Sequence, residues 1–569
     1  MIFKSAAPAV EIPGLDIPSF YIGASKLNSP SPDTLAYYDI ETGESLTFKQ
    51  LEAMYQQIGS GLVNKLSAQP GDVAAIFASN TVYFAPVLLG TISLGAVCCT
   101  VSSGFTESEL EYQLSDCNAR FLFVGVKQVP VVCSALSKGL LKIASSNIIV
   151  LKNNSTGNAK SSQVGFQTLN QLFCDKEFEQ KRIVNDKEAA SKMLAVIVYS
   201  SGTTGLPKGV MLSHQNFIAY TMQSATMFEY LGGKYCEELG IEPPEAPQRQ
   251  IAILPFAHIY GLTSLVTNSI AGGKTQYILN EFSIERFLQA LQDYKIQSAT
   301  AVPSVLSQIL NYKNIAKYDL SSLRVLSSGG APLPSGVHTN IKSRFPVNTG
   351  NGYGMSETCS GVCLMGNYMF QPGSVGFIYS ATEAKFVDPA TGKALGVGEE
   401  GEFCVRSPSI MLGYLNRPKE TAQTIDGDRF LHTGDIGYIN KTGHIFITDR
   451  MKELIKYKGL QIPPAELESI LMDHPLIADA AVIGIEDKQR NTEVPKAYIV
   501  SKSPATAADA SAARRLCADA ASWVAGKVAK HKRLRGGVEL TDHIPRNQSG
   551  KILRRELRAK HNAKHSAKF

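Results

Sequence analysis

The sequence predicts a mixed α/β protein. It would have a large N-terminal domain of doubly wound parallel sheets plus a smaller β-rich subdomain, and a small mobile α/β domain at the C-terminus. Three observations support this prediction. Apolar strand-like runs alternate with amphipathic helices through the first three quarters of the chain, which is typical of parallel sheets. Short strands and turns follow from about Glu400, and a new α/β pattern begins after residue 450. A length of 569 residues also exceeds what a single core usually covers.

The first clear unit lies in residues 73–106, which contain no charged side chain and are numerous enough to cross a bilayer. Serine, asparagine, proline and glycine interrupt this stretch, however. Its ends, "VAAIFA" and "AVCCTV", have the composition of buried strands, and "VYFAPVLLGTISLG" between them has that of a helix. A buried strand–helix–strand unit explains the stretch better than a membrane span, so we expect no transmembrane segment.

The middle of the chain continues the same alternation. The runs "IAILPF", "QSATAVPS" and "LRVLSSGG" are predicted strands, and "SIERFLQALQDYK" is a predicted helix between the first two. Residues 229–249, with "LGGK" and "IEPPEAPQ", are predicted to form an exposed loop. In the β-rich part, "GEFCVRS" and "GYINKTGHIFITD" are predicted strands, with a hairpin turn at residues 440–443.

The last part of the chain forms a separate predicted domain. In "PPAELESILMDHP", proline stands at the start of a helix and acidic residues follow in its first turns. The strands "AAVIGI" and "AYIV", a helix around Trp523 and a basic tail follow. We therefore predict one domain over residues 1–449 and a second over residues 450–569.

Composition narrows the class of protein further. An apolar content of 44% and a charged content of 19% indicate a globular chain. The net charge of +6 is concentrated near the C-terminus, which fits either an anionic ligand or a solvated basic face. Ten cysteines without regular spacing predict reduced, mostly buried thiols and no zinc site. The N-terminal segment lacks the long apolar core of a secretory signal.

The sequence "YSSGTTGLPKGVMLSH", at residues 199–214, follows an apolar run that is a predicted strand. Its glycines and clustered hydroxyls offer backbone and side-chain donors, and Lys208 adds a cation, so the loop suits a phosphate. It lacks the spacing of a Walker A loop, and Pro207 directly precedes the lysine. A tight strand-to-helix turn would need the glycines but not the hydroxyls and the lysine.

This loop resembles the phosphate-loop signature of the adenylate-forming superfamily, which includes acyl-CoA synthetases, 4-coumarate–CoA ligases and beetle luciferases. Further motifs of that superfamily follow in family order. They are "PFAHIYGL", "SSGGAPL", "NGYGMSET", "GEFCVRSPSIMLGYLNRPKET", "FLHTGDIGYI", "DRMKELIKYKG" and "IPRNQSGKILRREL". The resemblance covers nearly the whole chain and is strongest to the branch of 4-coumarate–CoA ligases.

The resemblance implies a two-step acid–thiol ligase. A carboxylic acid attacks the α-phosphorus of ATP, giving acyl-AMP and pyrophosphate, and CoA then displaces AMP. ATP, Mg²⁺ and CoA are the implied ligands, together with an aromatic or medium-chain acid, and no nucleic acid is expected. The oligomeric state stays open, with a monomer favoured. Two other readings also stay open, a luciferase-like oxidase of the adenylate and a nucleotide-binding pseudoenzyme.

The resemblance also assigns residues to the nucleotide. Asn351 departs from the more usual Gln and Ser356 from the more usual Thr, and both keep the polar group. Glu357 and Thr204 are the implied Mg²⁺ ligands. The implied nucleotide contacts are Ser200, Ser201, Gly202, Thr203, Thr204, Lys208, Gly330, Ala331, Asn351, Gly352, Tyr353, Gly354, Ser356, Asp435, Arg450 and Gln461.

The remaining implied roles concern the acid and the two half-reactions. Lys551 matches the catalytic lysine of the C-terminal domain, and His258 matches a histidine beside the reacting carboxylate. A core histidine and an ordinary helix face are the competing readings for His258 and Tyr260. The implied acyl pocket comprises His258, Tyr260, Ser264, Gly329 and Gly354, and the CoA-side positions comprise Lys458 and Gly459, with Lys456 beside them and Lys452 at the hinge.

The sequence leaves the location of the protein open between cytosol and peroxisome. The final tripeptide Ala-Lys-Phe, ending at Phe569, loosely resembles the peroxisomal address Ser-Lys-Leu. A plain solvated end of the chain explains it equally well.

Overall fold

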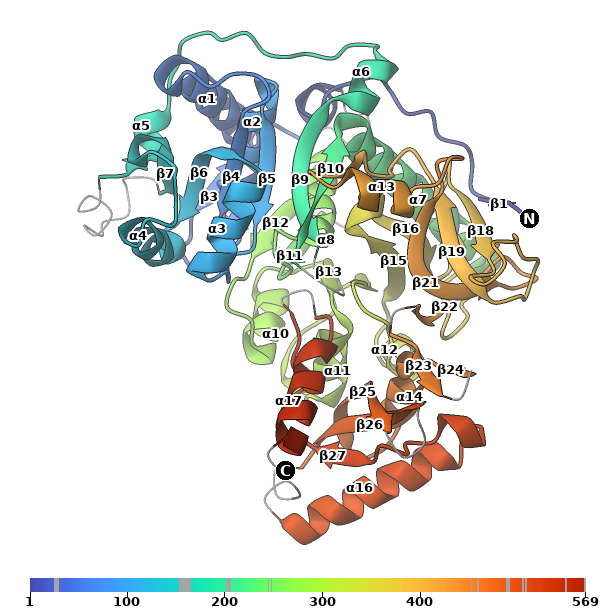
Figure 1. Cartoon of the computed structure of the whole chain (residues 1–569). Helices are drawn as coiled ribbons and strands as arrows, with labels where there is room; N and C mark the ends of the chain where they lie inside the picture. The colour runs from blue at the N-terminus through green and yellow to red at the C-terminus, as the bar shows by residue number, and fades with distance from the viewer. Residues whose placement is uncertain are drawn as a thin grey trace.

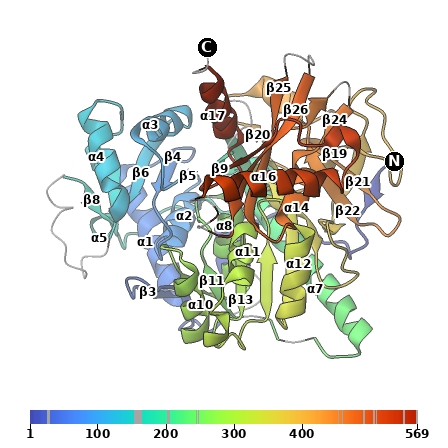
Figure 2. The same cartoon turned by 90° about the horizontal axis from the view of Figure 1, so that it is seen from below.

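The computed structural model describes residues 1–24, 30–152, 165–200, 206–243, 245–246, 248–451, 453–457, 460–487, 492–503, 506, 509–547 and 550–566. Figure 1 shows a large body with a smaller lobe beneath it that contains the C-terminal elements. In the view from below, that lobe lies over one side of the large body and leaves the side with α1 and α4 uncovered (Figure 2).

An eight-stranded sheet forms one half of the large body. The strands from β5 to β8 pair in parallel with their neighbours, whereas β10 pairs antiparallel with β9 and β20. In order across the sheet, the strands are β20 (Gly413–Tyr414), β10 (Lys208–Ser213), β9 (Leu194–Ser200), β5 (Val97–Val101), β4 (Val73–Phe77), β6 (Ala119–Gly125), β7 (Ile148–Leu151) and β8 (Gln167–Thr168).

Alternate residues of this sheet enter two different cores. On β4, Ala74 and Ile76 pack into one core together with α1 (Phe48–Leu66) and α2 (Phe84–Ser93). Ala75 and Phe77 pack into the other, with α3 (Glu107–Asp116) and α4 (Val129–Ser137). Helices thus cover both faces, as expected for a doubly wound sheet. The predicted buried strand–helix–strand unit of residues 73–106 is confirmed as β4, α2 and β5.

A nine-stranded sheet forms the other half of the large body, and it shares the first of these cores. Its central strands, from β2 to β15, run parallel, and its edge strands are antiparallel. The order is β17 (Phe377–Ile378), β16 (Ser360–Met365), β15 (Asn348–Met355), β14 (Val325–Ser328), β13 (Ser298–Ala301), β11 (Arg249–Ala252), β12 (Thr275–Ile278), β2 (Leu35–Asp39) and β3 (Ser45–Thr47).

Helices connect the strands of the nine-stranded sheet, and the sequence predicted one of them. The predicted helix after β12 is confirmed as α10 (Ile284–Asp293), which Ser283 caps by accepting a hydrogen bond from the backbone N–H of Arg286. The other helices of the large body are α5 (Leu169–Leu172), α6 (Lys187–Lys192), α7 (His214–Leu239), α8 (Ile259–Gly261), α9 (Asn268–Ala271), α11 (Pro303–Asn311), α12 (Ser335–Arg344) and α13 (Pro418–Thr424).

The predicted loop at residues 229–249 is wrong in its first half, because helix α7 continues to Leu239. Interior glycines cost a helix roughly 0.5–1 kcal/mol each. Burial of Met227, Leu231 and Cys236 along the same helix offsets that cost. The helix ends only at Gly240, whose φ of 64° lies in the left-handed region that closes many helices.

A five-stranded antiparallel sheet forms the β-rich subdomain, and it includes the N-terminal strand of the chain. The predicted strands and the turn at residues 440–443 are confirmed, and the turn is closed by a hydrogen bond from the Gly443 N–H to the Asn440 carbonyl. The order is β1 (Phe3–Lys4), β18 (Glu383–Val387), β19 (Gly401–Arg406), β21 (Leu431–Ile439) and β22 (Ile445–Arg450).

The C-terminal lobe is a small α/β unit. The predicted helix after residue 463 is confirmed as α14, with Pro464 in its first turn. Strand β25 pairs antiparallel with β26, and β27 pairs parallel with β26. Its elements are β23 (Ile455–Tyr457), β24 (Leu460–Ile462), α14 (Pro464–Met472), β25 (Ile477–Asp487), β26 (Thr492–Ser501), α16 (Ala510–Ala525), β27 (Val538–Leu540) and α17 (Arg554–Ser566).

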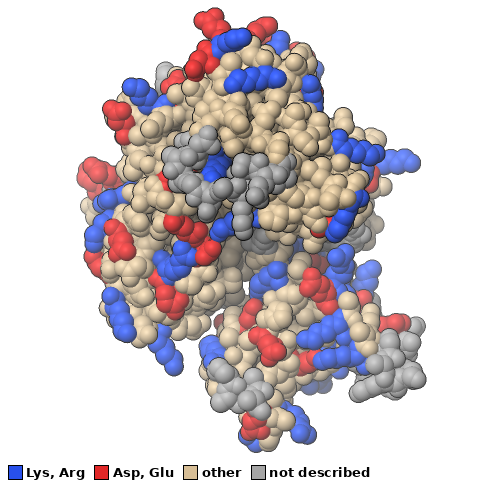
Figure 3. All heavy atoms as spheres, turned by 90° about the vertical axis from the view of Figure 1, so that its left-hand side faces the viewer, with Lys and Arg blue, Asp and Glu red and all other residues tan. Residues whose placement is uncertain are grey.

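The lobe has cores of its own, which include Leu467 and Tyr498, and these residues do not belong to the core of the large body. The core of the large body reaches Ile447, and the first core residue of the lobe is Ile455. The predicted boundary at residues 449–450 falls in this interval, and Lys452 lies outside the described residues. Figure 3 shows the lobe set apart from the larger body by a groove.

Two predictions from composition can be compared with the structure. All ten cysteines are unpaired in the structure and seven of them are buried, which confirms the predicted burial of most of them. In the part of the chain that the structure describes, no helix has the length and apolar character needed to cross a membrane.

Candidate functional site

A cavity of about 2460 Å³ lies where the two large sheets, the β-rich sheet and the C-terminal lobe meet. Residues that end or follow parallel strands line it, among them Ser200 at the end of β9 and Gly329 after β14. Ligands of open parallel sheets bind at the carboxyl ends of the strands, so this is the expected place for a site. Lys551 from the C-terminal lobe lines the same cavity.

The predicted phosphate loop connects two antiparallel strands. Ser200, the last residue of β9, pairs with Lys208, the first residue of β10, and both line the cavity. The motif therefore joins a strand to a strand, and the simple strand-to-helix turn is excluded. Ser201, Gly202, Thr203 and Thr204 lie outside the described residues.

Glu357 is a buried carboxylate at the centre of a small polar cluster. Its Oε1 accepts hydrogen bonds from the Tyr414 hydroxyl at 2.8 Å and from the Ser200 hydroxyl at 3.2 Å. The Nζ of Lys208 lies 4.9 Å from the centre of the Tyr414 ring. This arrangement brings the end of the phosphate loop, a cation and a carboxylate to one point, and Ser356 lines the cavity beside them.

Asp435 is the second buried carboxylate of the cavity. It accepts a hydrogen bond from the Tyr353 hydroxyl at 2.6 Å, and the Nε of Arg450 lies 3.3 Å from its other oxygen. Arg450 stands opposite Asp435 in the β21–β22 register, so the hairpin itself sets this pair. Burial raises the pKa of Asp435, while the Arg450 charge and the tyrosine hydrogen bond act to lower it.

Close backbone contacts shape the neighbouring wall. A Cβ on Gly354 would lie 1.8 Å from the carbonyl oxygen of Ser360, because the register between β15 and β16 shifts at this point. Only glycine fits there. Gly330 has a φ of 81°, in the left-handed region, where the chain leaves β14. Gly352 lines the cavity between these segments.

The predicted acyl-pocket residues come together at one side of the cavity. His258 caps the short helix α8 through its Nδ1, which accepts a hydrogen bond from the Tyr260 N–H at 3.3 Å. Burial lowers the pKa of His258 to about 4, so the ring is neutral at pH 7. A Cβ on Gly329 would lie 3.0 Å from the Tyr260 ring, so these two residues are in contact. Ser264 follows on the adjoining π-helix, Leu262–Thr267, and also lines the cavity.

Among the predicted site residues that follow the hinge at Lys452, Lys551 is the one that the structure both describes and brings to the cavity. Burial lowers its pKa to about 8, and the charge of Arg450 adds to the fall, while Glu453 and Asp435 act in the opposite direction. Lys551 is therefore half-buried near the Asp435–Arg450 pair.

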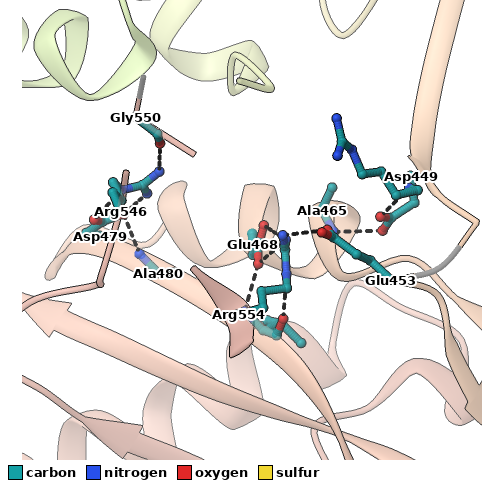
Figure 4. Close-up of polar contacts among 11 residues, drawn as sticks. Asp449, Glu453, Ala465, Glu468, Asp479, Ala480, Arg546, Gly550 and Arg554 are labelled. Carbon is teal, nitrogen blue, oxygen red and sulfur yellow. Dashed lines mark hydrogen bonds and ion pairs between the residues drawn. The ribbon is translucent and has the colours of Figure 1, made fainter. Parts of the chain in front are cut away.

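Two arginines hold the segment that carries this lysine (Figure 4). Arg546 donates hydrogen bonds to the Gly550 carbonyl and to Asp479, each at 2.8 Å. Arg554 forms ion pairs at 2.7 Å with Glu468 on α14 and with Glu453, which follows the predicted hinge. Anchors on both sides thus fix the backbone around residue 551, and one of them ties it to the connection between the domains.

Several predicted residues do not reach the cavity or cannot be placed there. Asn351 is buried and donates to the Ser374 carbonyl at 3.5 Å, and neither it nor Ala331 lines the cavity. Lys456 is exposed on β23, away from it. The side chain of Gln461 and all of Lys452, Lys458 and Gly459 lie outside the described residues.

Sequence reasoning missed Tyr414, although "MLGYLNRP" was among the quoted motifs. It also missed a cluster in which Glu402, Cys404 and His432 bring potential metal-ligand atoms within 4.8 Å of one another. The Nδ1 of His432 lies 2.8 Å from Glu402, and this contact raises the pKa of His432. Side chains alternate between the two faces of β19 and β21, and the pairing of these strands brings the three residues together on one face. The cluster can therefore be recognised only once the strand register is known.

Comparisons with known proteins agree with this geometry. A family model described as AMP-binding enzyme matches residues 27–415, and one described as AMP-binding enzyme C-terminal domain matches residues 466–551. A probable 4-coumarate–CoA ligase 1 from Dictyostelium discoideum is 34% identical, over 98% of this chain and 97% of its own. 4-coumarate–CoA ligase 2 from Petroselinum crispum is also 34% identical, with the same coverage.

Solved structures share the fold. The o-succinylbenzoate CoA synthetase of Bacillus subtilis, in complex with ATP and magnesium, matches with a TM-score of 0.72 and 26% identity over 95% of this chain and 99% of its own. An anthranilate CoA ligase in complex with anthranoyl-AMP matches with a TM-score of 0.79 and 24% identity over 95% and 96% of the two chains.

Proposed function

The chain belongs to the family of AMP-binding enzymes and is a CoA ligase that activates a carboxylic acid as an acyl adenylate; on that premise we propose which of its residues serve each half-reaction and what acid it takes. The enzyme uses ATP with Mg²⁺, and CoA as the acceptor. The observation that supports the residue assignment best is that Lys551 shares one cavity with Ser200, Glu357 and Asp435.

Adenylation is mainly a problem of placing charge. In our proposal Lys208 and the loop before it bind the phosphates that leave, and Asp435 accepts hydrogen bonds from the ribose while Arg450 holds the carboxylate in place. Lys551 donates to the oxygens on which negative charge grows as the acid attacks the α-phosphorus. Neutral His258 is oriented by its hydrogen bond with the Tyr260 N–H, and it lies beside the acid without adding charge.

The residues present fit a magnesium ion. Glu357 is a hard oxygen ligand, buried at 6% exposure, and the two hydroxyl groups that bind it fix its orientation toward the cavity. When bound, the ion would neutralise phosphate charge. We assign Glu357 as its protein ligand, and Thr204 stays a proposal from the family resemblance.

Thioester formation would use the other side of the C-terminal domain. Lys458 and Gly459 are proposed to guide CoA after the domain rotates about Lys452, because one arrangement cannot offer both Lys551 and "KYKG" to the same acyl group. This proposal rests on the family resemblance, since those three residues lie outside the described part of the chain.

We propose an aromatic or medium-chain acid as substrate. We also propose a monomeric enzyme, because one chain supplies every proposed contact.

We further propose that the Ala-Lys-Phe tripeptide directs part of the protein to peroxisomes. One relative, from Arabidopsis thaliana, is named peroxisomal OPC-8:0-CoA ligase 1. A reporter carrying the last dozen residues that stays diffuse in cells would remove the location proposal.

A product assay tests the proposed function. The enzyme is incubated with ATP, Mg²⁺ and a panel of aromatic and straight-chain acids, with and without CoA. We expect AMP, pyrophosphate and acyl-CoA in equal amounts. Light or an oxidised acid would favour a luciferase-like reaction, and no acid-dependent product would favour a nucleotide-binding pseudoenzyme.

A further inference from the structure

The acyl side of the cavity extends well beyond Tyr260. It follows the face of the nine-stranded sheet toward the start of its strands, where Gln250, Ser298 and Val325 line it. Ala301 pairs with Ser328 at the nucleotide end, and Ser298 lies three residues earlier on the same strand. At about 3.3 Å per residue, this extension measures about 10 Å.

The floor of this extension is polar. Gln276, Gln250 and Ser298 stand in register on the neighbouring strands β12, β11 and β13. The Gln250 amide accepts a hydrogen bond from Gln276 at 3.0 Å and donates one to the Thr300 hydroxyl at 3.1 Å. Central parallel strands are usually built from apolar side chains, so a row of amides and hydroxyls is unusual for a pocket that takes a plain hydrocarbon tail.

Two hydroxyl groups in the wall have no hydrogen-bond partner among the described residues. They belong to Ser298 and Ser328, whose exposed fractions are 5% and 1%, and both residues line the cavity. Buried polar groups are nearly always paired in proteins, so these two hydroxyls add to the polar character of this wall.

Lys274 stands at the end of the extension, directly before β12, and lines the cavity. Its backbone is fixed by Ser269, whose carbonyl accepts from the Lys274 N–H at 2.9 Å and whose hydroxyl donates to the Lys274 carbonyl at 3.0 Å. Its aliphatic stem lies on Gly272, where an added Cβ would be 3.2 Å from the lysine Cε.

The Lys274 residue is half-buried at this end of the cavity. Within the described part of the chain, no carboxylate forms an ion pair with it, and burial lowers its pKa. A cation held partly out of water is costly unless an anion or several acceptors pair with it. Because Lys274 lines the cavity, a ligand bound there can supply that anion.

We propose that the acid substrate carries a second anionic group, a carboxylate, at the end remote from the reacting one, and that Lys274 binds it. The substrate class is therefore an elongated dicarboxylic acid, whose remote carboxylate lies at the end of the extension lined by Lys274, Gln250 and Ser298. This inference rests on the proposed function, since it assigns the far end of the same acyl pocket.

The test compares acids that differ only in the remote group. Straight-chain dicarboxylic acids of increasing length are each paired with the monocarboxylic acid of equal length, and acid-dependent pyrophosphate release gives kcat/KM for both. We expect the wild-type enzyme to prefer the dicarboxylic acid by at least about 10-fold once its length spans the extension.

Lys274→Met then keeps the length of the side chain and removes the charge. The preference should disappear, while turnover of the monocarboxylic acid is retained and the Tm does not fall. Lys317→Met, on an exposed lysine that does not line the cavity, is the matched control and should keep the preference.

The outcomes separate the two proposals. If the wild-type enzyme turns over monocarboxylic acids as well as their dicarboxylic partners, the inference is wrong and the ligase function stands. A preference that persists in Lys274→Met would remove the lysine from the site. If no acid of either class releases pyrophosphate, the proposed function itself fails.

Discussion

Replacing Lys551 by methionine should abolish most adenylation and leave thioester formation largely intact. The change removes the ammonium group and keeps the length of the side chain. Lys551 lines the cavity near Asp435 and Arg450, and the anchors at Arg546 and Arg554 hold its backbone, so the substitution should not displace the segment.

The burial of Lys551 and the usual contribution of one preorganised donor set the expected loss of adenylation rate. The pKa of Lys551 falls from 10.5 to about 8, which at ~1.36 kcal/mol per pKa unit corresponds to about 3 kcal/mol. This is the cost of holding the charged amine in the unliganded cavity at neutral pH, and bound phosphates would offset it. Loss of one preorganised donor to a developing charge lowers kcat by about 10²–10³-fold. We therefore expect adenylation to fall by that factor, without a lower Tm.

The pH dependence gives an independent check. The charged amine is the active form, so kcat/KM for ATP, which reports the free enzyme, should be highest below pH 8 and fall as the pH rises through about 8. The residual rate of Lys551→Met should not show this fall. Lys456→Met, which removes an exposed lysine of the same domain, is the control.

Separate assays of the two halves complete the experiment. Adenylation is followed by pyrophosphate release, and thioester formation by adding acyl-AMP and CoA. Gly459→Leu should show the reverse pattern, with adenylation spared. If Lys551→Met slows both halves equally, or keeps the wild-type pH profile, the assignment of this lysine to adenylation is refuted.

Three further substitutions follow from the contacts in the cavity. Glu357→Gln keeps the shape but weakens an oxygen ligand, so the Mg²⁺ concentration for half-maximal rate should rise by at least about 10-fold; an unchanged Mg²⁺ titration would exclude Glu357 as ligand. Asp435→Asn should weaken ATP binding by about 10–100-fold, because hydrogen bonds to a charged group contribute about 1.5–3 kcal/mol; calorimetric titration with ATP would show this, and an unaltered Kd would contradict it. Tyr260→Ala should shift the kcat/KM ratio toward bulkier acids by about 10–100-fold, with Tyr260→Phe as the control that keeps the ring, and equal ratios across acid sizes would remove Tyr260 from the pocket.

The architecture could be predicted because its signals are local. Alternating apolar strands and amphipathic helices along residues 73–106 give the order of β4, α2 and β5 without knowledge of the rest of the chain. The same local reasoning failed at "LGGK", because glycines weaken a helix by a fixed amount but the packing of Met227 and Leu231 decides whether it continues.

The sequence could predict a site residue that lies within a motif. It could not predict contacts between residues from distant segments of the chain. Glu357 and Asp435 stand in motifs, whereas the bond between Tyr414 and Glu357 joins positions 57 residues apart. Lys274 carries no sequence signal at all, because its place in the cavity wall follows from the pairing of β12 between β11 and β2. Asn351 shows the converse, since it stands in a motif but its side chain lies away from the cavity.

The central claim is that this cavity forms an acyl adenylate before CoA takes part. The most direct measurement is the exchange of radiolabelled pyrophosphate into ATP, with the acid present and CoA left out. The account predicts exchange that requires the acid and Mg²⁺ and is lost in Lys551→Met. Exchange without any acid, or its absence under conditions in which acyl-CoA forms with CoA present, would contradict the account.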